Sequence, residues 1–162
     1  MGEGEDNVKD APVTHLALQK LLYFVQSWSR TLLDQAMFDD DCEAWVHGAV
    51  YPNVYSVFRQ FKYAPLPSVE ESLEFGEQEQ RILNAVKKYY FDIYSAKALE
   101  EICHREPPYI ETREGFPEGK ACHKVMDAEK ISSYYGKVVQ KYKIRLSDMS
   151  NIKVYLSIIL SY

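Results

Sequence analysis

The sequence has no long hydrophobic run, few cysteines and no excess of positive charge. No apolar segment approaches the ~20 residues of a membrane-spanning helix, and the acidic, polar start from Met1 to Asp10 does not fit a secretory signal peptide. Three irregularly spaced cysteines argue against a disulfide framework and indicate the reducing cytoplasm. With 19 Lys and Arg against 24 Asp and Glu, the net charge of −5 argues against sequence-independent DNA binding. We therefore expect a cytoplasmic protein whose partners include neither membrane nor nucleic acid.

The familiar catalytic motifs are also missing. The sequence contains no phosphate-binding loop, dinucleotide-binding glycine motif, nucleophile elbow or His-Glu-x-x-His pair. Glu43 and His47 stand four residues apart and could form an acid–base pair on one helical turn. No nucleophile or anion-binding turn lies near them in the sequence. We predict that the chain is not an enzyme and uses no cofactor, with an acid–base hydrolase kept as an alternative.

Candidate metal ligands are present, but their spacing is wrong for a metal site. The set consists of two Cys-His dipeptides and two residues upstream: Cys103-His104, Cys122-His123, Cys42 and His47. Structural zinc sites usually pair ligands roughly two to four residues apart, and adjacent side chains diverge. The run Asp39-Asp40-Asp41 lacks the alternating ligands and the glycine of a calcium loop. We predict no bound metal, and a metal-dependent hydrolase is a second alternative.

What the sequence does contain is a set of amphipathic helices within one domain. A length of 162 residues fits a single domain. Thr14, Ser95 and Asp127 are suited to cap helix starts, and Pro52 is suited to a first helical position. Apolar residues recur at helical spacing over about 14–32, 52–61, 77–94, 96–103, 128–142 and 151–162. The prediction is a mainly α fold, a compact single domain of six or seven helices over residues 12–162, preceded by a polar linker over residues 1–11.

Two segments are harder to assign. Residues 106–126 contain three prolines and two glycines, so we expect one long irregular segment there, with room for a small hairpin. The segment from Glu43 to Val50 is too short to be assigned by periodicity.

Lys20 interrupts the apolar run of the first predicted helix. The stripe on that helix consists of Leu18, Leu21, Leu22 and Val25. By the helical count Lys20 and Tyr23 lie off this stripe. Lys20 is then either a snorkelling side chain on an exposed flank or part of a polar contact, and the sequence leaves both open. We expect Lys20 and Glu43 to share one polar contact beneath Trp45.

Several blocks of the sequence resemble a known family. They read Leu18-Gln19-Lys20-Leu21-Leu22-Tyr23-Phe24, Phe38-Asp39-Asp40 and Glu43-Ala44-Trp45-x-His47-Gly48-x-Val50-x-Pro52-x-Val54-Tyr55, with a looser later block of Ser95-Ala96, Leu99, Cys103-His104 and Pro108-Tyr109. Over about Pro12 to Tyr142 the chain resembles the Panacea domain, the phage-associated family of SocA-like antitoxins. Ala49, Cys103 and Tyr109 stand where the family usually has Pro, Thr and Trp.

The order of the segments departs from that family. Its members usually open with an amphipathic helix before the Leu-Gln-Lys block, where this chain has the polar residues 1–11. The segment from Met149 to Tyr162 looks like that opening helix. We therefore expect the chain to be circularly permuted relative to the family. Residues 149–162 would pack against the helix that holds the Leu18 stripe, with Tyr162 near the N-terminal linker.

The resemblance implies an antitoxin that neutralises a cognate protein toxin by direct binding. With 13 tyrosines and a net charge of −5, we expect a tyrosine-rich, acidic surface that suits a basic toxin. The first family block places the partner-binding surface at His47, Tyr51 and Tyr55, with His104 as a further candidate. A phage-associated regulatory or structural module without a toxin is the alternative, and the oligomeric state is left open.

Overall fold

The helix that begins after Thr14 is the element around which the other helices pack. The computed structural model describes residues 13–62, 64–67 and 73–161, so the predicted linker over 1–11 and Tyr162 lie outside it. Within the described residues there are seven α-helices and one two-stranded hairpin, which confirms the mainly α class. Helix α1 (His15–Leu32) begins as predicted, because the Thr14 hydroxyl accepts a hydrogen bond from the Ala17 amide at 3.3 Å.

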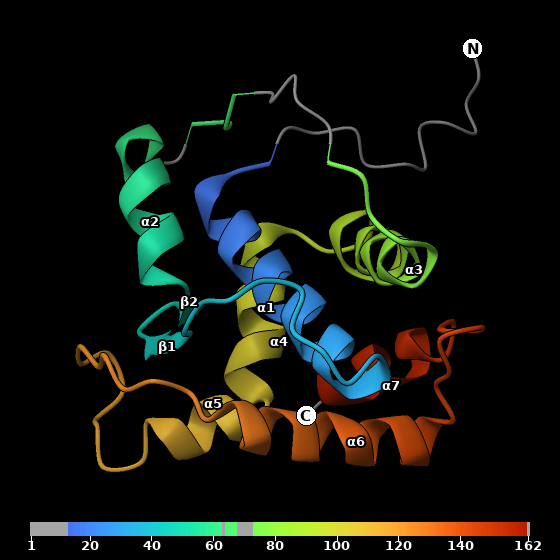
Figure 1. Cartoon of the computed structure of the whole chain (residues 1–162). Helices are drawn as coiled ribbons and strands as arrows, with labels where there is room; N and C mark the ends of the chain where they lie inside the picture. Colours follow the sequence, from blue (N-terminus) through green and yellow to red (C-terminus); the bar gives the residue numbers. More distant parts are fainter. Residues whose placement is uncertain (1–12, 63, 68–72, 162) are drawn as a thin grey trace.

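Figure 1 shows α1 crossing the middle of the molecule. The elements that follow are β1 (Glu43–Trp45), β2 (Gly48–Val50), α2 (Pro52–Phe58), the 3₁₀ turn η2 (Arg59–Phe61), α3 (Glu77–Val86), the π-helical turn η3 (Lys87–Phe91), α4 (Ala96–Arg105), α5 (Pro107–Thr112), α6 (Ala128–Tyr142) and α7 (Ile152–Ile159). Helices α3, α4 and α6 pack against α1 on different sides, and the hairpin lies at one end of the molecule beside α2.

The local start signals in the sequence are confirmed. Pro52 is the first residue of α2, and the Ser95 hydroxyl accepts from the Ala98 amide at 3.1 Å to cap α4. The Asp127 carboxylate caps α6 through the Glu129 amide at 2.8 Å. The predicted helix over 77–94 exists, but its second part is the π-helical turn η3. That wider turn buries three consecutive aromatic residues, Tyr89, Tyr90 and Phe91.

The prediction for residues 106–126 was partly wrong. Pro107–Thr112 forms α5, because Pro107 occupies a first helical position where its missing amide hydrogen is not needed. The hairpin lies at β1 and β2, in the segment that periodicity could not assign. The later part of 106–126 runs beside β1, where the Ala44 amide donates to the Lys124 carbonyl at 3.0 Å.

The burial of α1 differs from the predicted stripe. Leu18, Leu21 and Leu22 are only half-buried, whereas Lys20 and Tyr23 are fully buried. The reason is that neighbouring elements cover α1 on several sides, so the apolar stripe does not mark the single face turned to the core.

A buried carboxylate joins four segments of the chain. Glu106, between α4 and α5, is 0% exposed. Its carboxylate accepts hydrogen bonds from the hydroxyls of Tyr23 (2.7 Å), Tyr135 (2.9 and 2.8 Å) and Tyr155 (2.6 Å). These tyrosines come from α1, α6 and α7. Burial raises the pKa of Glu106 to about 7, against the lowering effect of the three hydroxyl donors. We call this group the Glu106 cluster.

The Glu106 cluster corrects the expected tyrosine-rich surface. Of the eleven tyrosines within the described residues, seven are buried. Besides the three of the cluster they are Tyr51, Tyr89, Tyr90 and Tyr109. The tyrosine excess therefore mainly builds a hydrogen-bonded core.

The C-terminal segment is an integral helix, as predicted. Ile152, Tyr155 and Leu156 of α7 are buried. The expected packing partner was wrong, since α7 packs chiefly against α6 and α4 rather than α1. The circular permutation itself stays a prediction.

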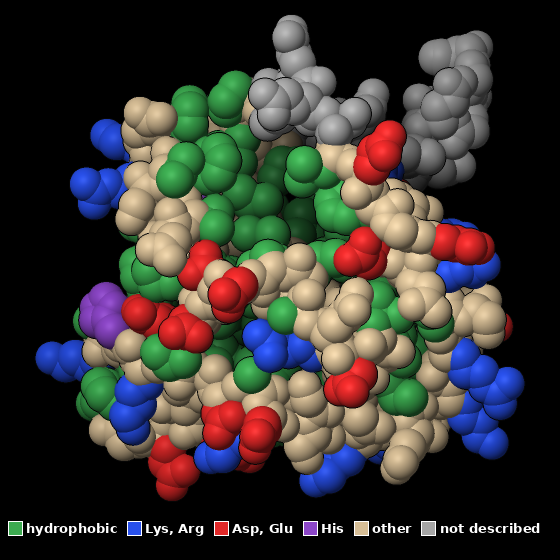
Figure 2. Space-filling model, viewed as in Figure 1, with side chains coloured by type: hydrophobic (Ala, Val, Ile, Leu, Met, Phe, Trp, Pro, Cys, Tyr) green, Lys and Arg blue, Asp and Glu red, His purple; other side chains and the backbone are tan. Residues whose placement is uncertain are grey.

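Charged side chains of both signs are interspersed over the face seen in Figure 2, and hydrophobic side chains gather around a hollow between α2 and α3. The negative net charge is therefore not gathered into one block on this face. Charge complementarity to a binding partner would depend on local patches of the surface. None of the helices within the described ranges is long and apolar enough to cross a membrane.

Candidate partner-binding site

The hairpin β1–β2 is held from inside by polar side chains of α1. The Lys20 ammonium donates to the Ala49 carbonyl at 2.7 Å, and the Gln19 amide oxygen accepts from the Tyr51 amide at 2.8 Å. The Ala49 amide in turn donates to the Cys103 sulfur of α4 at 3.3 Å. Two adjacent residues of α1 thus fix the second strand and the start of α2.

Gly48 permits this close approach. Its φ of +104° is a conformation that other residues rarely adopt, and a Cβ atom there would lie 2.7 Å from Lys20 Cε. Glycine is therefore favoured at position 48 for two reasons: the backbone has a positive φ, and the buried Lys20 side chain leaves no room for a Cβ atom.

The turn of the hairpin is held from the other side by α4 and α5. His104 Nε2 lies 3.0 Å from the Val46 carbonyl, which can only accept, so this nitrogen carries the proton. The Tyr109 hydroxyl donates to the carbonyls of Trp45 and Val46, and the Arg113 guanidinium donates to a β1 carbonyl at 2.9 Å. Burial lowers the pKa of His104, against the opposing effect of Glu100. The hairpin turn is consequently a rigid projection.

The predicted contact between Lys20 and Glu43 is not formed. Lys20 is fully buried and donates to a carbonyl, whereas the Glu43 carboxylate accepts from the Trp45 indole at 2.8 Å. Glu43 also lies 3.5 Å from His123. Trp45 and Glu43 are therefore brought together, and Lys20 supports the same hairpin from beneath through its backbone. Burial lowers the pKa of Lys20.

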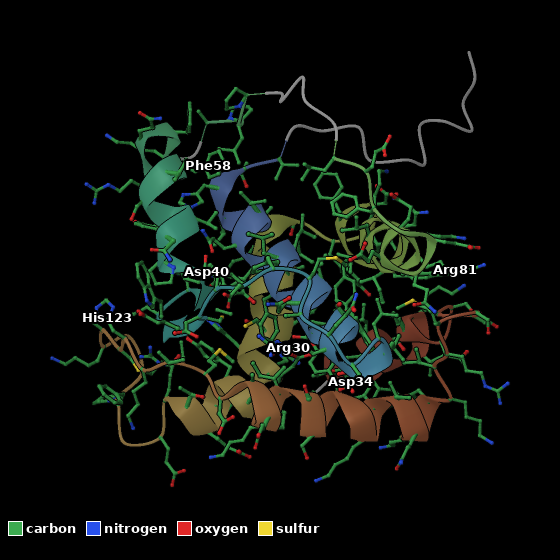
Figure 3. The ribbon with its side chains drawn as sticks, in the orientation of Figure 1. Arg30, Asp34, Asp40, Phe58, Arg81 and His123 are labelled. Atoms are coloured by element: carbon green, nitrogen blue, oxygen red, sulfur yellow. The ribbon has the colours of Figure 1, made fainter. Side chains whose placement is uncertain are left out.

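A cleft of about 440 Å³ opens on one side of the hairpin. Its walls come from the start of α1, the hairpin turn, α2 with η2, and the loop that carries Cys122. Its titratable lining residues are His15, Lys20, Tyr55, His47, Arg59, Lys62, Cys122 and His123, and none of the described residues that line it is an aspartate or glutamate. We call it the cationic cleft. Figure 3 shows His123 on the loop beside the hairpin, on the side of the molecule that also carries α2.

A second cleft of about 750 Å³ opens on the other side of the same turn. Its lining contains five glutamates, Glu100, Glu101, Glu111, Glu114 and Glu118, against the cations Lys97 and Arg113. We call it the acidic cleft. Val46 and His47 line both clefts, so the hairpin turn separates two regions of opposite charge.

The structure does not bring together the pair considered for acid–base chemistry. His47 Nδ1 lies 3.4 Å from the buried Glu100 carboxylate, which also contacts Lys97 at 3.2 Å. Glu43 is engaged with Trp45 instead. The His47 side chain is 72% exposed, so its ring is available at the tip of the hairpin.

The four predicted partner-binding residues divide by exposure. His47 is exposed, Tyr55 is half-buried against Trp45 with ring centroids 4.8 Å apart, and the His104 side chain is 28% exposed. Tyr51 is only 2% exposed and packs against Phe38, so its assignment to a binding surface is wrong and its role is packing. The three accessible residues all lie at the hairpin or directly beside it.

The cysteines and histidines considered as metal ligands do not form one site, although His47 and His104 lie 3.4 and 3.8 Å from the Glu100 carboxylate. Among the described residues, no group of three or more His, Cys, Asp and Glu side chains is placed to hold a metal ion. All three cysteines are free and buried, and burial raises the pKa of Cys103 to about 12. Such a thiol is a packing group rather than a nucleophile at neutral pH.

Sequence reasoning missed the charged rims of both clefts. Arg59 and Lys62 gave no signal, since exposed cations beyond a short helix look like ordinary surface. Glu100 could have been noticed, because it stands four residues before His104 and shares its helix face. The pairing of Glu100 with His47 depends on the hairpin and has no local sequence signature.

The contacts described above bring together, in space, several of the sequence blocks quoted in the sequence analysis. Gln19 and Lys20, the hairpin from Glu43 to Val50, and the pair Cys103-His104 with Tyr109 form one assembly around the hairpin. A family model described as "Antitoxin SocA-like, Panacea domain" matches residues 18–109, more than half of the chain. Searches of curated proteins and of solved structures returned no match. The chain therefore belongs to the family of SocA-like antitoxins that carry the Panacea domain.

Proposed function

We propose that this protein is an antitoxin that neutralises a cognate protein toxin by binding it directly through the surface around the hairpin turn. The observation that carries the proposal is the hairpin itself. Its backbone is bonded from α1, α4 and α5, yet it presents the exposed His47 between two clefts. A rigid projection between recesses binds a partner without the entropy cost of ordering a loop.

The negative charge of the acidic cleft suits a toxin whose contacting region is basic. Glu111, Glu114 and Glu118 are exposed along one side of the hairpin turn, and the whole chain carries a net charge of −5. Complementary charge mainly accelerates encounter and selects the partner. The free, buried thiols are consistent with action in the cytoplasm. The proposal assigns the protein no reaction and no cofactor.

The test is neutralisation of the product of the neighbouring gene. We expect that product to stop growth when it is expressed alone, co-expression of this chain to restore growth, and the two proteins to co-purify. His47→Ala and Tyr55→Ala should each weaken binding by about 30-fold, since hot-spot truncations cost about 2 kcal/mol or more. Ile93→Ala is a matched control, because Ile93 is 55% exposed after η3 and outside both clefts.

Two results would contradict the proposal. Growth restored without a complex would indicate a regulatory role rather than direct binding. A neighbouring gene whose product is harmless would favour the phage-associated structural or regulatory module.

A further inference from the structure

The cationic cleft differs in sign of charge from the protein as a whole. The chain has a net charge of −5, yet no acidic residue lines this cleft in the part of the chain that the structure describes. Arg59 and Lys62 are exposed at its rim, whereas His123, at the opposite wall, is already paired with the Glu43 carboxylate at 3.5 Å, so the positive charge comes from Arg59 and Lys62. A local reversal of charge on an acidic protein favours an anionic group at this position and disfavours a basic one.

The wall of the cleft is aromatic and apolar. Trp45 and Tyr55 lie edge to face with ring centroids 4.8 Å apart, and Leu16 and Val50 extend the apolar surface. The volume of about 440 Å³ lies in the range of small ligand sites, about 300–1,000 Å³. The cleft therefore has room for a few side chains and not for a helix bundle or a domain.

The buried Lys20 ammonium group lies directly beneath this wall. Its ammonium group has three donors, and the structure gives it one acceptor, the Ala49 carbonyl at 2.7 Å. Among the described residues, no carboxylate forms an ion pair with it. The charge of this buried ammonium group is partly opposed by the nearby Glu100, and what remains raises the positive potential of the adjacent cleft, because low polarity screens it weakly.

We propose that the cationic cleft receives a short segment of the partner protein in which an apolar side chain stands next to a carboxylate. The apolar side chain would pack on Trp45 and Tyr55, and the carboxylate would meet Arg59 and Lys62. This inference rests on the proposed function, because it names the chemistry of the partner at one side of the hairpin. An extended polyanion such as nucleic acid fits less well, since it would meet the acidic cleft across the shared His47.

The protein contains its own reporter for this site. Of its two tryptophans, Trp45 lines the cleft, whereas Trp28 is fully buried in the core. The probe is the peptide acetyl-Leu-Asp-Leu-Asp-amide, titrated to about 1 mM while tryptophan fluorescence is recorded. We expect a saturable change. The counterpart with Asn in place of Asp should bind at least about tenfold more weakly, equivalent to about 1.4 kcal/mol.

Paired charge variants separate the cleft from the surface in general. The double variant Arg59→Gln, Lys62→Gln should weaken peptide binding at least about tenfold. The control Lys130→Gln, Lys137→Gln removes the same charge from exposed positions on α6 and should leave binding unchanged. Circular dichroism of each variant checks that the fold is retained.

The outcomes distinguish this inference from the function on which it depends. Equal binding of the Asp and Asn peptides, no binding by either, or saturable binding of a thymidine oligonucleotide in their place would overturn the inference. If Arg59→Gln, Lys62→Gln still neutralises the neighbouring toxin fully while His47→Ala does not, the inference fails and the antitoxin function stands. If the unaltered chain itself fails to neutralise, the proposed function fails.

Discussion

Gly48 is the residue at which the backbone of the hairpin and the side chain of Lys20 approach most closely. Gly48→Ala would add a Cβ atom 2.7 Å from Lys20 Cε at a φ of +104°. We expect the free energy of unfolding to fall by about 2–4 kcal/mol, the sum of backbone strain and steric overlap. Urea unfolding measures this change.

Gly115→Ala is the matched control for that substitution. Gly115 has a φ of +92°, but nothing lies within 4 Å of an added Cβ. Its variant should lose only about 1 kcal/mol, from backbone strain alone. Equal losses for the two variants would show that Lys20 yields easily and does not fix the hairpin.

Glu106 makes stability depend on pH. Its pKa in the folded protein is about 7, above the ordinary 4.5, so between these values the folded chain holds a proton that the unfolded chain releases. The free energy of unfolding should therefore fall as pH rises from about 4.5 to 7, by about 3 kcal/mol in total.

The variant Glu106→Gln isolates this effect, because glutamine does not titrate. We expect the difference in unfolding free energy between the parent chain and this variant to change steadily across the same pH window, as measured by urea unfolding at several pH values. His15 and His104, whose pKa values are lowered by burial, contribute equally to both chains. A constant difference would mean that the three tyrosine hydroxyls fully stabilise the ionised carboxylate.

At the scale of elements, α7 is the one whose removal is most informative. Leu156 is 0% exposed, and Leu156→Ala should cost about 2–5 kcal/mol through the cavity it leaves. Val154, on the same helix and 47% exposed, should change stability by less than about 0.5 kcal/mol when replaced by alanine. Thermal unfolding followed by circular dichroism compares the two.

Deleting residues 149–162 should abolish soluble folding, and a soluble, cooperatively unfolding truncation would contradict this.

Elements whose limits are set locally were the ones that could be predicted from the sequence. Thr14, Ser95 and Asp127 mark helix starts through hydrogen bonds within their own first turn, and Pro52 marks one through its fixed φ and missing amide hydrogen, so neighbouring residues carry the signal. The hairpin could not be predicted, because each strand has three residues and its stability comes from side chains of α1, α4 and α5.

The candidate site was only partly predictable for the same reason. His47 and Tyr55 stand in a conspicuous block, and the structure leaves them accessible. Tyr51 stands in the same block and is buried, because the inward or outward direction of a side chain after a hairpin depends on the tertiary packing of α1. Lys20 shows the converse, a charged residue placed in the core by the hairpin above it.

At the scale of the whole molecule, the predicted circular permutation can be tested by expressing a chain whose segments are rearranged. A chain that begins at Met149, runs to Tyr162 and continues from Gly2 to Asp148 would restore the usual family order. The link from Tyr162 to the start of α1 would consist of the eleven residues 2–12. Fully extended they span at most about 40 Å, which exceeds the length of about 27 Å of the 18-residue α1.

We expect this rearranged chain to unfold cooperatively, with the same dependence on urea concentration as the parent chain. Its stability should be lower by a small amount, since the cut removes the bond from the Ser150 amide to the Asp148 carboxylate. An unfolded or aggregated product would contradict the predicted permutation.

The Glu106 cluster also has a consequence for the order of events during synthesis. Its hydroxyl donors lie at residues 23, 135 and 155, on segments that are far apart in the sequence. While the ribosome is still translating the region beyond Glu106, the carboxylate has only the first of these donors available. The last arrives only with α7, which must also clear the exit tunnel before it can pack. Final packing of the core therefore waits until α7 has been made, and newly made chains pass through an interval in which a proteolytic system meets them incompletely folded.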